Sequence, residues 1–247
     1  MLKTLIAAAA ERLGYTIIPN WQLGSYSAAE NLRKLFALLS IDLVIDVGAN
    51  AGQFRDLLRT QVGYRGRIAS FEPNLELARS LQARVKADPS WEVMGTALGS
   101  AAGEAEFNIM ADNQFSSFLA PRHDEVARFK DMNVVREQAR VQIVTLDSVM
   151  PELTERHASR GVFLKLDTQG YDLEVLKGAS ASLPRIAALQ TEAALRPIYA
   201  GAPSDRAVID YAAAHGFVVS GFFPSNAGHF PELIDYDCQM VRRDATA

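Results

Sequence analysis

The chain has 247 residues, of which 49% are hydrophobic, and a formal net charge of −4, a composition typical of a folded protein with one substantial core. Its 25 basic and 29 acidic residues argue against a large phosphate-binding surface, so we expect no nucleic-acid partner. The single cysteine, Cys238, cannot form an internal disulfide, and no Cys or His spacing suggests a zinc site.

The lack of a disulfide pair favours a reducing compartment, and the predicted localisation is cytoplasmic. No apolar run of about 20 residues is present, so we expect no membrane span. The apolar start of the chain is short and reaches charged residues at once, which favours an amphipathic helix over a signal peptide. The sequence leaves open whether the chain forms a homo-oligomer.

The first 40 residues predict a helical extension, with helical apolar spacing over 1–13 and 27–40. Asn20, Trp21 and Gly24 fall between these two segments. We expect the extension, 1–40, either to cover the mouth of a ligand site or to cap the sheet of a single domain over 41–247.

From residue 41 onward, short apolar runs alternate with longer amphipathic ones, which predicts an α/β fold with a doubly wound, mostly parallel sheet. The predicted strands of this sheet are 42–47, 67–71, 91–95, 161–166 and 185–191. The predicted helices are 52–61, 74–87, 171–181 and 204–215. A final antiparallel strand pair is expected at 217–223 and 237–242.

The alternation is interrupted between residues 98 and 145. Two strands are predicted there, 104–110 and 139–146, on either side of a polar, irregular stretch. Loops at the carboxyl edge of an open sheet carry specificity. We therefore expect this insertion to face the substrate.

A ligand-binding loop is predicted where the first strand ends. The strand reaches Asp46 and turns through Gly48-Ala49-Asn50-Ala51-Gly52 into a helix, a pattern that lets the backbone approach a ligand closely. Glu72 follows the second strand, where a carboxylate can accept hydrogen bonds from ribose hydroxyls. Asn50 replaces the second glycine of the dinucleotide fingerprint, which disfavours a pyrophosphate. The pattern therefore indicates a nucleoside ligand more than a purely structural turn.

These segments resemble the FkbM-type methyltransferases, a branch of the class I S-adenosylmethionine-dependent enzymes. The resemblance covers about residues 41 to 200. The matching segments are 45–54, 71–73, 97–99, 116–117 and 164–179. It implies a seven-stranded fold, S-adenosylmethionine as cofactor and, most often, methylation of a hydroxyl on a small molecule or glycan. Gln169 departs from the family pattern, which usually has Glu at this position.

The resemblance also implies roles for individual residues. It puts Glu72 at the ribose, Ala97 and Leu98 at the adenine, and Ser116 at the cofactor or acceptor. The residues implied around the methionine part of the cofactor are Asp46, Gly48, Asn50, Gly52, Gln53 and Phe54. Ala49, Pro73 and Asp167 are also expected to bind the cofactor.

Three side chains are candidates for the chemistry. Asp167 ends the fourth major strand beside the cofactor loop and is predicted to be the base or to orient the acceptor, although an Asp there could also cap the next helix. Glu192 follows the next strand, and His123 in the insertion is a secondary base candidate. Lys165 shares a strand face with Asp167 and could pair with it. Two acids do not make a full coordination shell, so a divalent metal is not expected.

Two alternative functions remain open at this point. One is an NAD-type nucleotide-binding or dehydrogenase-like protein with the same sheet topology, against which Asn50 argues. The other is a protein that binds S-adenosylmethionine without catalysis, which a cleft too closed for an acceptor would favour.

Overall fold

The computed structural model describes residues 6, 9, 10, 12–124, 126–156, 159–225 and 231–246. Most of the helix predicted over 1–13 lies outside the described residues. Within the described part of the chain, no helix is long and apolar enough to cross a membrane.

The described chain forms a seven-stranded sheet with strand order β3-β2-β1-β7-β8-β10-β9, in which β10 runs antiparallel to both of its neighbours, β8 and β9. The strands are β1 (Leu43–Val47), β2 (Arg67–Phe71), β3 (Trp91–Met94), β7 (Val162–Leu166), β8 (Ile186–Ala194), β9 (Phe217–Pro224) and β10 (Asp235–Arg242). This topology confirms the predicted α/β fold with its doubly wound, mostly parallel sheet and closing antiparallel pair.

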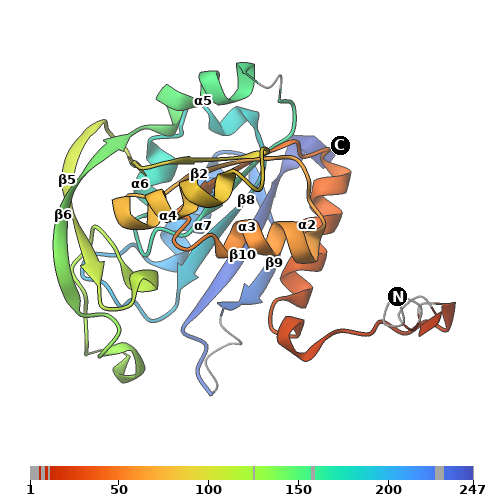
Figure 1. Ribbon diagram of the computed structural model, residues 1–247, viewed down its shortest axis with the longest axis horizontal. Helices are drawn as coiled ribbons and strands as arrows, with labels where there is room; N and C mark the ends of the chain where they lie inside the picture. Colours follow the sequence, from red (N-terminus) through yellow and green to blue (C-terminus); the bar gives the residue numbers. More distant parts are fainter. Residues whose placement is uncertain are drawn as a thin grey trace.

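Helices cover both faces of the sheet (Figure 1). One face packs against α5 (Leu146–Glu155), α6 (Asp172–Lys177) and α7 (Asp205–Ala214). The other packs against α2 (Tyr26–Leu38), α3 (Gln53–Leu57), the π-helical turn η2 (Leu58–Val62) and α4 (Leu75–Val85). In β1, Leu43, Ile45 and Val47 belong to the first core and Val44 to the second, because successive strand side chains point to opposite faces. Burial on both faces explains why the central strands are continuously apolar.

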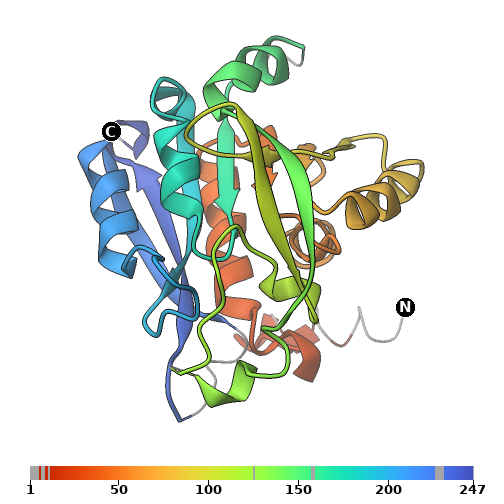
Figure 2. The same ribbon diagram turned by 90° about the vertical axis from the view of Figure 1, so that its left-hand side faces the viewer.

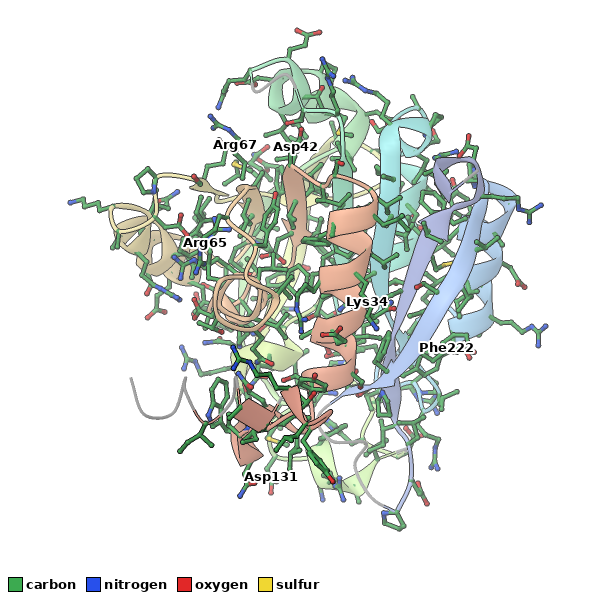
Figure 3. All side chains as sticks on the ribbon, turned by 90° about the vertical axis from the view of Figure 1, so that its right-hand side faces the viewer. Lys34, Asp42, Arg65, Arg67, Asp131 and Phe222 are labelled. Carbon is green, nitrogen blue, oxygen red and sulfur yellow. The ribbon has the colours of Figure 1, made fainter. Side chains whose placement is uncertain are left out.

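Helix α2, predicted as part of the N-terminal extension, packs into the same layered core as the rest of the chain. Leu32 and Phe36 are buried against the sheet. Asn31 Nδ2 donates to Ser220 Oγ of β9 at 3.0 Å and to Gln239 Oε1 of β10 at 2.9 Å. Figure 3 shows α2 lying across this face of the sheet. The short η1 (Asn20–Gln22) precedes it.

The insertion builds a second, three-stranded sheet with strand order β4-β6-β5. Its strands are β4 (Ala97–Leu98), β5 (Gly103–Met110) and β6 (Val135–Val144). Figure 2 shows β5 and β6 as a long antiparallel ribbon in front of the main sheet. The chain between them returns to the sheet edge, where Pro121 forms an isolated bridge with Tyr199. Both strands predicted in the insertion are present.

Two helical segments differ from the sequence-based expectation. Helix α5 was not predicted, because Pro151 lies inside it and proline disfavours a helix interior. Thr145 Oγ1 caps it by accepting from Ser148 N at 3.2 Å, and Leu146 and Met150 bury its apolar face. The single helix expected over 52–61 is instead α3 followed by the π-helical turn η2.

Candidate active site

A cavity of about 520 Å³ opens at the carboxyl edge of the sheet. Its wall includes the segments that directly follow β1, β2 and β7, together with residues of the insertion and of the chain before α2. Cavities of this size suit small-molecule ligands, and the carboxyl edge is where open α/β sheets bind them.

The loop after β1 approaches β7 so closely that only glycine fits at its first position. Gly48 has φ +79°, and a Cβ on it would overlap the main-chain oxygen of Asp167. Asn50 also adopts a left-handed conformation, with φ +48°. Its main-chain N–H donates to Glu72 Oε2 at 2.6 Å. The Asn50 N–H therefore joins the loop after β1 to the carboxylate that follows β2.

Glu72 is held by main-chain donors on both carboxylate oxygens. Besides the bond from Asn50, its Oε1 accepts from Asn74 N at 2.8 Å. The side chain is 4% exposed. Burial raises the pKa of Glu72 to about 7, although the two backbone N–H groups oppose this shift. The carboxylate can still accept hydrogen bonds from a ligand on the lone pairs that these donors leave.

A buried ion-pair cluster lies under the loop. Lys165 Nζ is 3.1 Å from Asp167 Oδ2, 3.4 Å from Asp46 Oδ1 and 3.3 Å from the main-chain oxygen of Gly48. Burial disfavours the ammonium charge, but the two carboxylates outweigh it and raise the pKa of Lys165. Ser70 Oγ donates to Asp46 Oδ2 at 2.9 Å. Lys165 thus links the loop after β1 to the end of β7 and remains charged.

The second half of the cavity is lined by acidic and amide side chains. Gln169 Nε2 donates to Asp167 Oδ1 at 3.1 Å and to Glu192 Oε2 at 2.7 Å. Asp237 lies close by on β10, and burial and the charge of Asp167 raise its pKa to about 7. Burial and the charge of Asp167 also raise the pKa of Glu192 well above its ordinary value. Asp235 lines the same wall. This half of the cavity is therefore strongly acidic.

Most of the residues named from the sequence lie together in the cavity wall: Gly48, Ala49, Asn50, Gln53, Phe54, Glu72, Pro73, Ala97, Leu98, Ser116, Asp167 and Glu192. Asp46 is fully buried beneath the loop, and Gly52 starts α3 behind it. His123 lies away from this wall, and its Nε2 donates to the main-chain oxygen of Asn133 at 2.6 Å. The structure therefore gives His123 no contact with the other candidates.

Several wall residues were not singled out from the sequence. They come from segments distant along the chain and are Ser25, Phe107, Phe118, Tyr171, Gln190, Asp235 and Asp237. Two acids at alternate positions of one strand were a usable signal for Asp235 and Asp237, because such side chains share a face. In the described part of the chain, no group of three or more His, Cys, Asp or Glu side chains is arranged to hold a metal ion.

Residues 46–219 match the sequence profile of the Methyltransferase FkbM domain. The chain belongs to the FkbM methyltransferase family. This family is S-adenosylmethionine-dependent, so the cofactor is S-adenosylmethionine, and the predicted family resemblance is confirmed. No curated protein matches the chain in sequence.

Among solved structures, the FkbM methyltransferase from Methylobacillus flagellatus KT is 16% identical, with 81% of this chain and 43% of that chain covered and a TM-score of 0.49. The chain thus spans less than half the length of that protein. Aeropyrum pernix fibrillarin is 13% identical, with 87% and 74% covered and a TM-score of 0.47. A S-adenosylmethionine-dependent methyltransferase from Aquifex aeolicus is 12% identical, with 95% and 98% covered and a TM-score of 0.45.

The cavity fits the cofactor of this FkbM family member in shape and chemistry. Gly48 lets the loop after β1 pack against the main-chain oxygen of Asp167, and the loop and Glu72 line the same cavity. Pro73, Ala97 and Leu98 add an apolar wall beside Glu72, which suits a purine ring between ribose contacts and the core. The acidic side chains around Asp167 suit the positive charge of a sulfonium group.

Proposed function

We propose that this family member transfers the methyl group of S-adenosylmethionine to a hydroxyl of a small molecule or sugar. When bound, the cofactor supplies a methyl group activated by the adjacent positive sulfur. The observation that carries the proposal is the Asp167 carboxylate in the cavity wall, held between Lys165 and Gln169 directly beside the Gly48 turn.

The end of the cavity near β2 is proposed to hold the nucleoside part of the cofactor. Glu72 would accept hydrogen bonds from the ribose hydroxyls, with Pro73, Ala97 and Leu98 against the adenine. The Gly48–Asn50 turn would lie along the methionine part. Asp46 would have an indirect role. Its buried carboxylate lies beneath the loop, where it helps to fix Lys165 and does not line the cavity.

Asp167 is proposed to receive the proton of the acceptor hydroxyl. Lys165 and Gln169 hold this carboxylate in the cavity wall, and a carboxylate within hydrogen-bond reach of a hydroxyl can accept its proton. Glu192, two hydrogen bonds away through Gln169, would orient the acceptor. Alignment and exclusion of water supply the rest of the rate enhancement in a displacement of this kind.

Membership of a methyltransferase family speaks against the dehydrogenase-like alternative. The extent of the cavity argues against binding without catalysis. Its wall continues from Glu72 and Leu98 past Asp167 to Asp235 and Pro224, which leaves a second, acidic region for an acceptor.

Replacement of Glu72 tests the cofactor site. Glu72→Ala removes a carboxylate whose hydrogen bonds to ligand hydroxyls are charge-assisted, so we expect S-adenosylmethionine affinity to fall about tenfold or more in titration calorimetry. Glu76→Ala changes an exposed acid in the first turn of α4 and is expected to keep wild-type affinity. Equal affinity of wild type and Glu72→Ala would refute this assignment.

Replacement of Asp167 tests the chemistry. Asp167→Asn keeps the size of the side chain and removes the proton acceptor, so turnover is expected to fall about a hundredfold, while S-adenosylmethionine still binds. The assay follows S-adenosylhomocysteine formed with a panel of monosaccharides, polyols and phenols, and mass spectrometry locates the methyl group. Asp124→Asn, at an exposed ion pair with Arg122, is the matched control. Methylation confined to nitrogen or carbon acceptors would contradict O-methylation.

A further inference from the structure

The Gln169 side chain makes hydrogen bonds with three other side chains in the acidic half of the cavity. Its Nε2 donates to Asp167 and to Glu192, and its Oε1 accepts from the hydroxyl of Tyr199 at 2.8 Å. Its main-chain oxygen accepts from Ser117 Oγ at 2.8 Å. With φ +54°, the backbone is in the left-handed region, which is uncommon for residues other than glycine. These contacts hold the residue in a conformation that the chain would otherwise avoid.

The partners of Gln169 require an amide. Two carboxylates can only accept hydrogen bonds when ionised, so the group between them must supply two N–H donors. The Tyr199 hydroxyl lies 2.8 Å from Gln169 Oε1 and 2.7 Å from the main-chain oxygen of Phe115, and it can donate its single proton to either acceptor. A primary amide offers two donors and one acceptor in a single rigid plane. A glutamate here would put a third carboxylate against Asp167 and Glu192.

The amide also completes the surroundings of Asp167, the proposed base. Asp167 Oδ2 is held by the Lys165 ammonium and Asp167 Oδ1 by Gln169. A donor on each oxygen fixes the plane of the carboxylate, and Asp167 lies in the cavity wall.

On the basis of the proposed function, we propose that Gln169 is a positioning residue. Its amide holds the carboxylates of Asp167 and Glu192 in one fixed arrangement beside the cofactor. The acceptor hydroxyl then meets a preorganised pair instead of two mutually repelling acids. Gln169 itself need not touch the reacting atoms.

The charges around this pair explain why a donor between them matters. Burial and the charge of Asp167 raise the pKa of Glu192, so each hydrogen bond to its ionised form counts against protonation. The other charged or titratable groups around the pair come from β7, β10, α6 and the chain after β8. They are Lys165, Asp235, Asp237, Asp172 and Tyr199. Lys165 supplies the compensating positive charge.

The test measures the titration of Glu192 directly and needs no acceptor. The protein is labelled with carbon-13 at the glutamate side-chain carboxyl, and the Glu192 signal is identified by its loss in Glu192→Gln. Gln169→Met keeps the length of the side chain and removes both donors. We expect the titration midpoint of Glu192 to rise by about one to two pH units, because the ionised form loses a charge-assisted hydrogen bond. Gln169→Glu is expected to raise the midpoint too, by adding a third carboxylate.

Gln114→Met is the matched control, since Gln114 is an exposed glutamine in the wall of the same cavity. It is expected to leave the midpoint unchanged. A Glu192 midpoint in both Gln169 variants within about 0.2 pH units of wild type would overturn the proposal. If Gln169→Met does not fold, Gln169→Glu, which keeps an acceptor for Tyr199, decides alone.

Calorimetry separates this proposal from the proposed function. S-adenosylhomocysteine is expected to bind both Gln169 variants with nearly wild-type affinity, because Glu72 and the Gly48 turn are untouched. An unchanged Glu192 midpoint with intact binding refutes only the role of Gln169. If Glu72→Ala binds S-adenosylmethionine as tightly as wild type, the proposed cofactor site is refuted. The proposal for Gln169 then still depends on the Glu192 titration.

Discussion

The two halves of the cavity are built in different ways. Near β1 and β2 the wall comes from two short segments, which hold the turn at Gly48, the N–H of Asn50 and one carboxylate, Glu72. Near β7, β8 and β10 it is built from side chains that only folding brings together, such as Gln169 and Asp237. We call the first region the cofactor half and the second the acceptor half, after their proposed roles. A turn in which the backbone itself makes a close contact tolerates few substitutions, whereas side chains in the wall can be altered one residue at a time.

The largest effect is expected from a change in the backbone of the cofactor half. In Gly48→Ala, the new Cβ would overlap the main-chain oxygen of Asp167, and φ is +79°. We expect the free energy of unfolding to fall by about 3 kcal/mol or more and cofactor binding to be lost. Urea denaturation and calorimetry measure the two effects.

Gly63→Ala separates backbone conformation from close approach. Gly63 has nearly the same φ, +77°, but a Cβ on it would meet nothing within 4 Å. Its substitution is expected to cost only about 1 kcal/mol, the penalty for the left-handed region alone. If both variants lose the same free energy of unfolding, the close contact between the loop after β1 and the end of β7 does not contribute to stability.

The same difference explains what the sequence could predict. The sheet, the Gly48 turn and Glu72 follow from local signals, because apolar periodicity and glycine placement act over a few residues. The lining by Asp235 and Asp237 depends on β10 pairing with β8, a contact between segments about 45 residues apart that no local pattern specifies.

Gln169 and Pro151 mark two features that the sequence did not predict. Gln169 was noted only as a departure from a family pattern, and its bonds to Asp167 and Glu192 depend on a left-handed backbone that sequence does not reveal. Helix α5 was not predicted because it contains Pro151, and proline disfavours a helix interior. The roles of the individual site residues therefore stay predictions, while the fold and the family are established.

A pH experiment compares one buried acid from each half. The pKa of Glu72 is raised to about 7 from an ordinary 4.5. Between these values the folded state binds more protons than the unfolded state, so the free energy of unfolding falls as pH rises through this window. The difference corresponds to about 3 kcal/mol. We therefore expect Glu72→Gln, which mimics the protonated form, to gain up to that amount relative to wild type between pH 4.5 and pH 8, as measured by urea denaturation.

Asp237→Asn gives the corresponding measurement for the acceptor half. The pKa of Asp237 is also raised to about 7, first by burial and then by the charge of Asp167, with Lys165 opposing. The gain relative to wild type should have the same sign. Glu76→Gln, at an exposed position, should show no pH-dependent gap. A constant gap for Glu72→Gln at low and high pH would contradict a raised pKa.

The smallest effect is expected for the segment before α2. We predict that this segment belongs to the cofactor half of the cavity. Trp21 lines the cavity although it is 70% exposed. Ser25 nearby donates to Gln61 of η2 at 2.9 Å, which links this segment to the helix after the cofactor loop. We therefore expect S-adenosylhomocysteine alone to shift the Trp21 fluorescence to shorter wavelength. The other tryptophan, Trp91, is buried and donates to Ser70 Oγ at 3.0 Å, so its emission should not respond.

Single-tryptophan variants assign the signal. Trp21→Phe should abolish the fluorescence response and weaken S-adenosylhomocysteine binding by only about fivefold or less, since an aromatic contact at an exposed site contributes about 1 kcal/mol. Trp91→Phe should retain the response. A response that needs a hydroxyl acceptor in addition to S-adenosylhomocysteine would instead assign Trp21 to the acceptor half, and that half would then include a residue from the segment before α2.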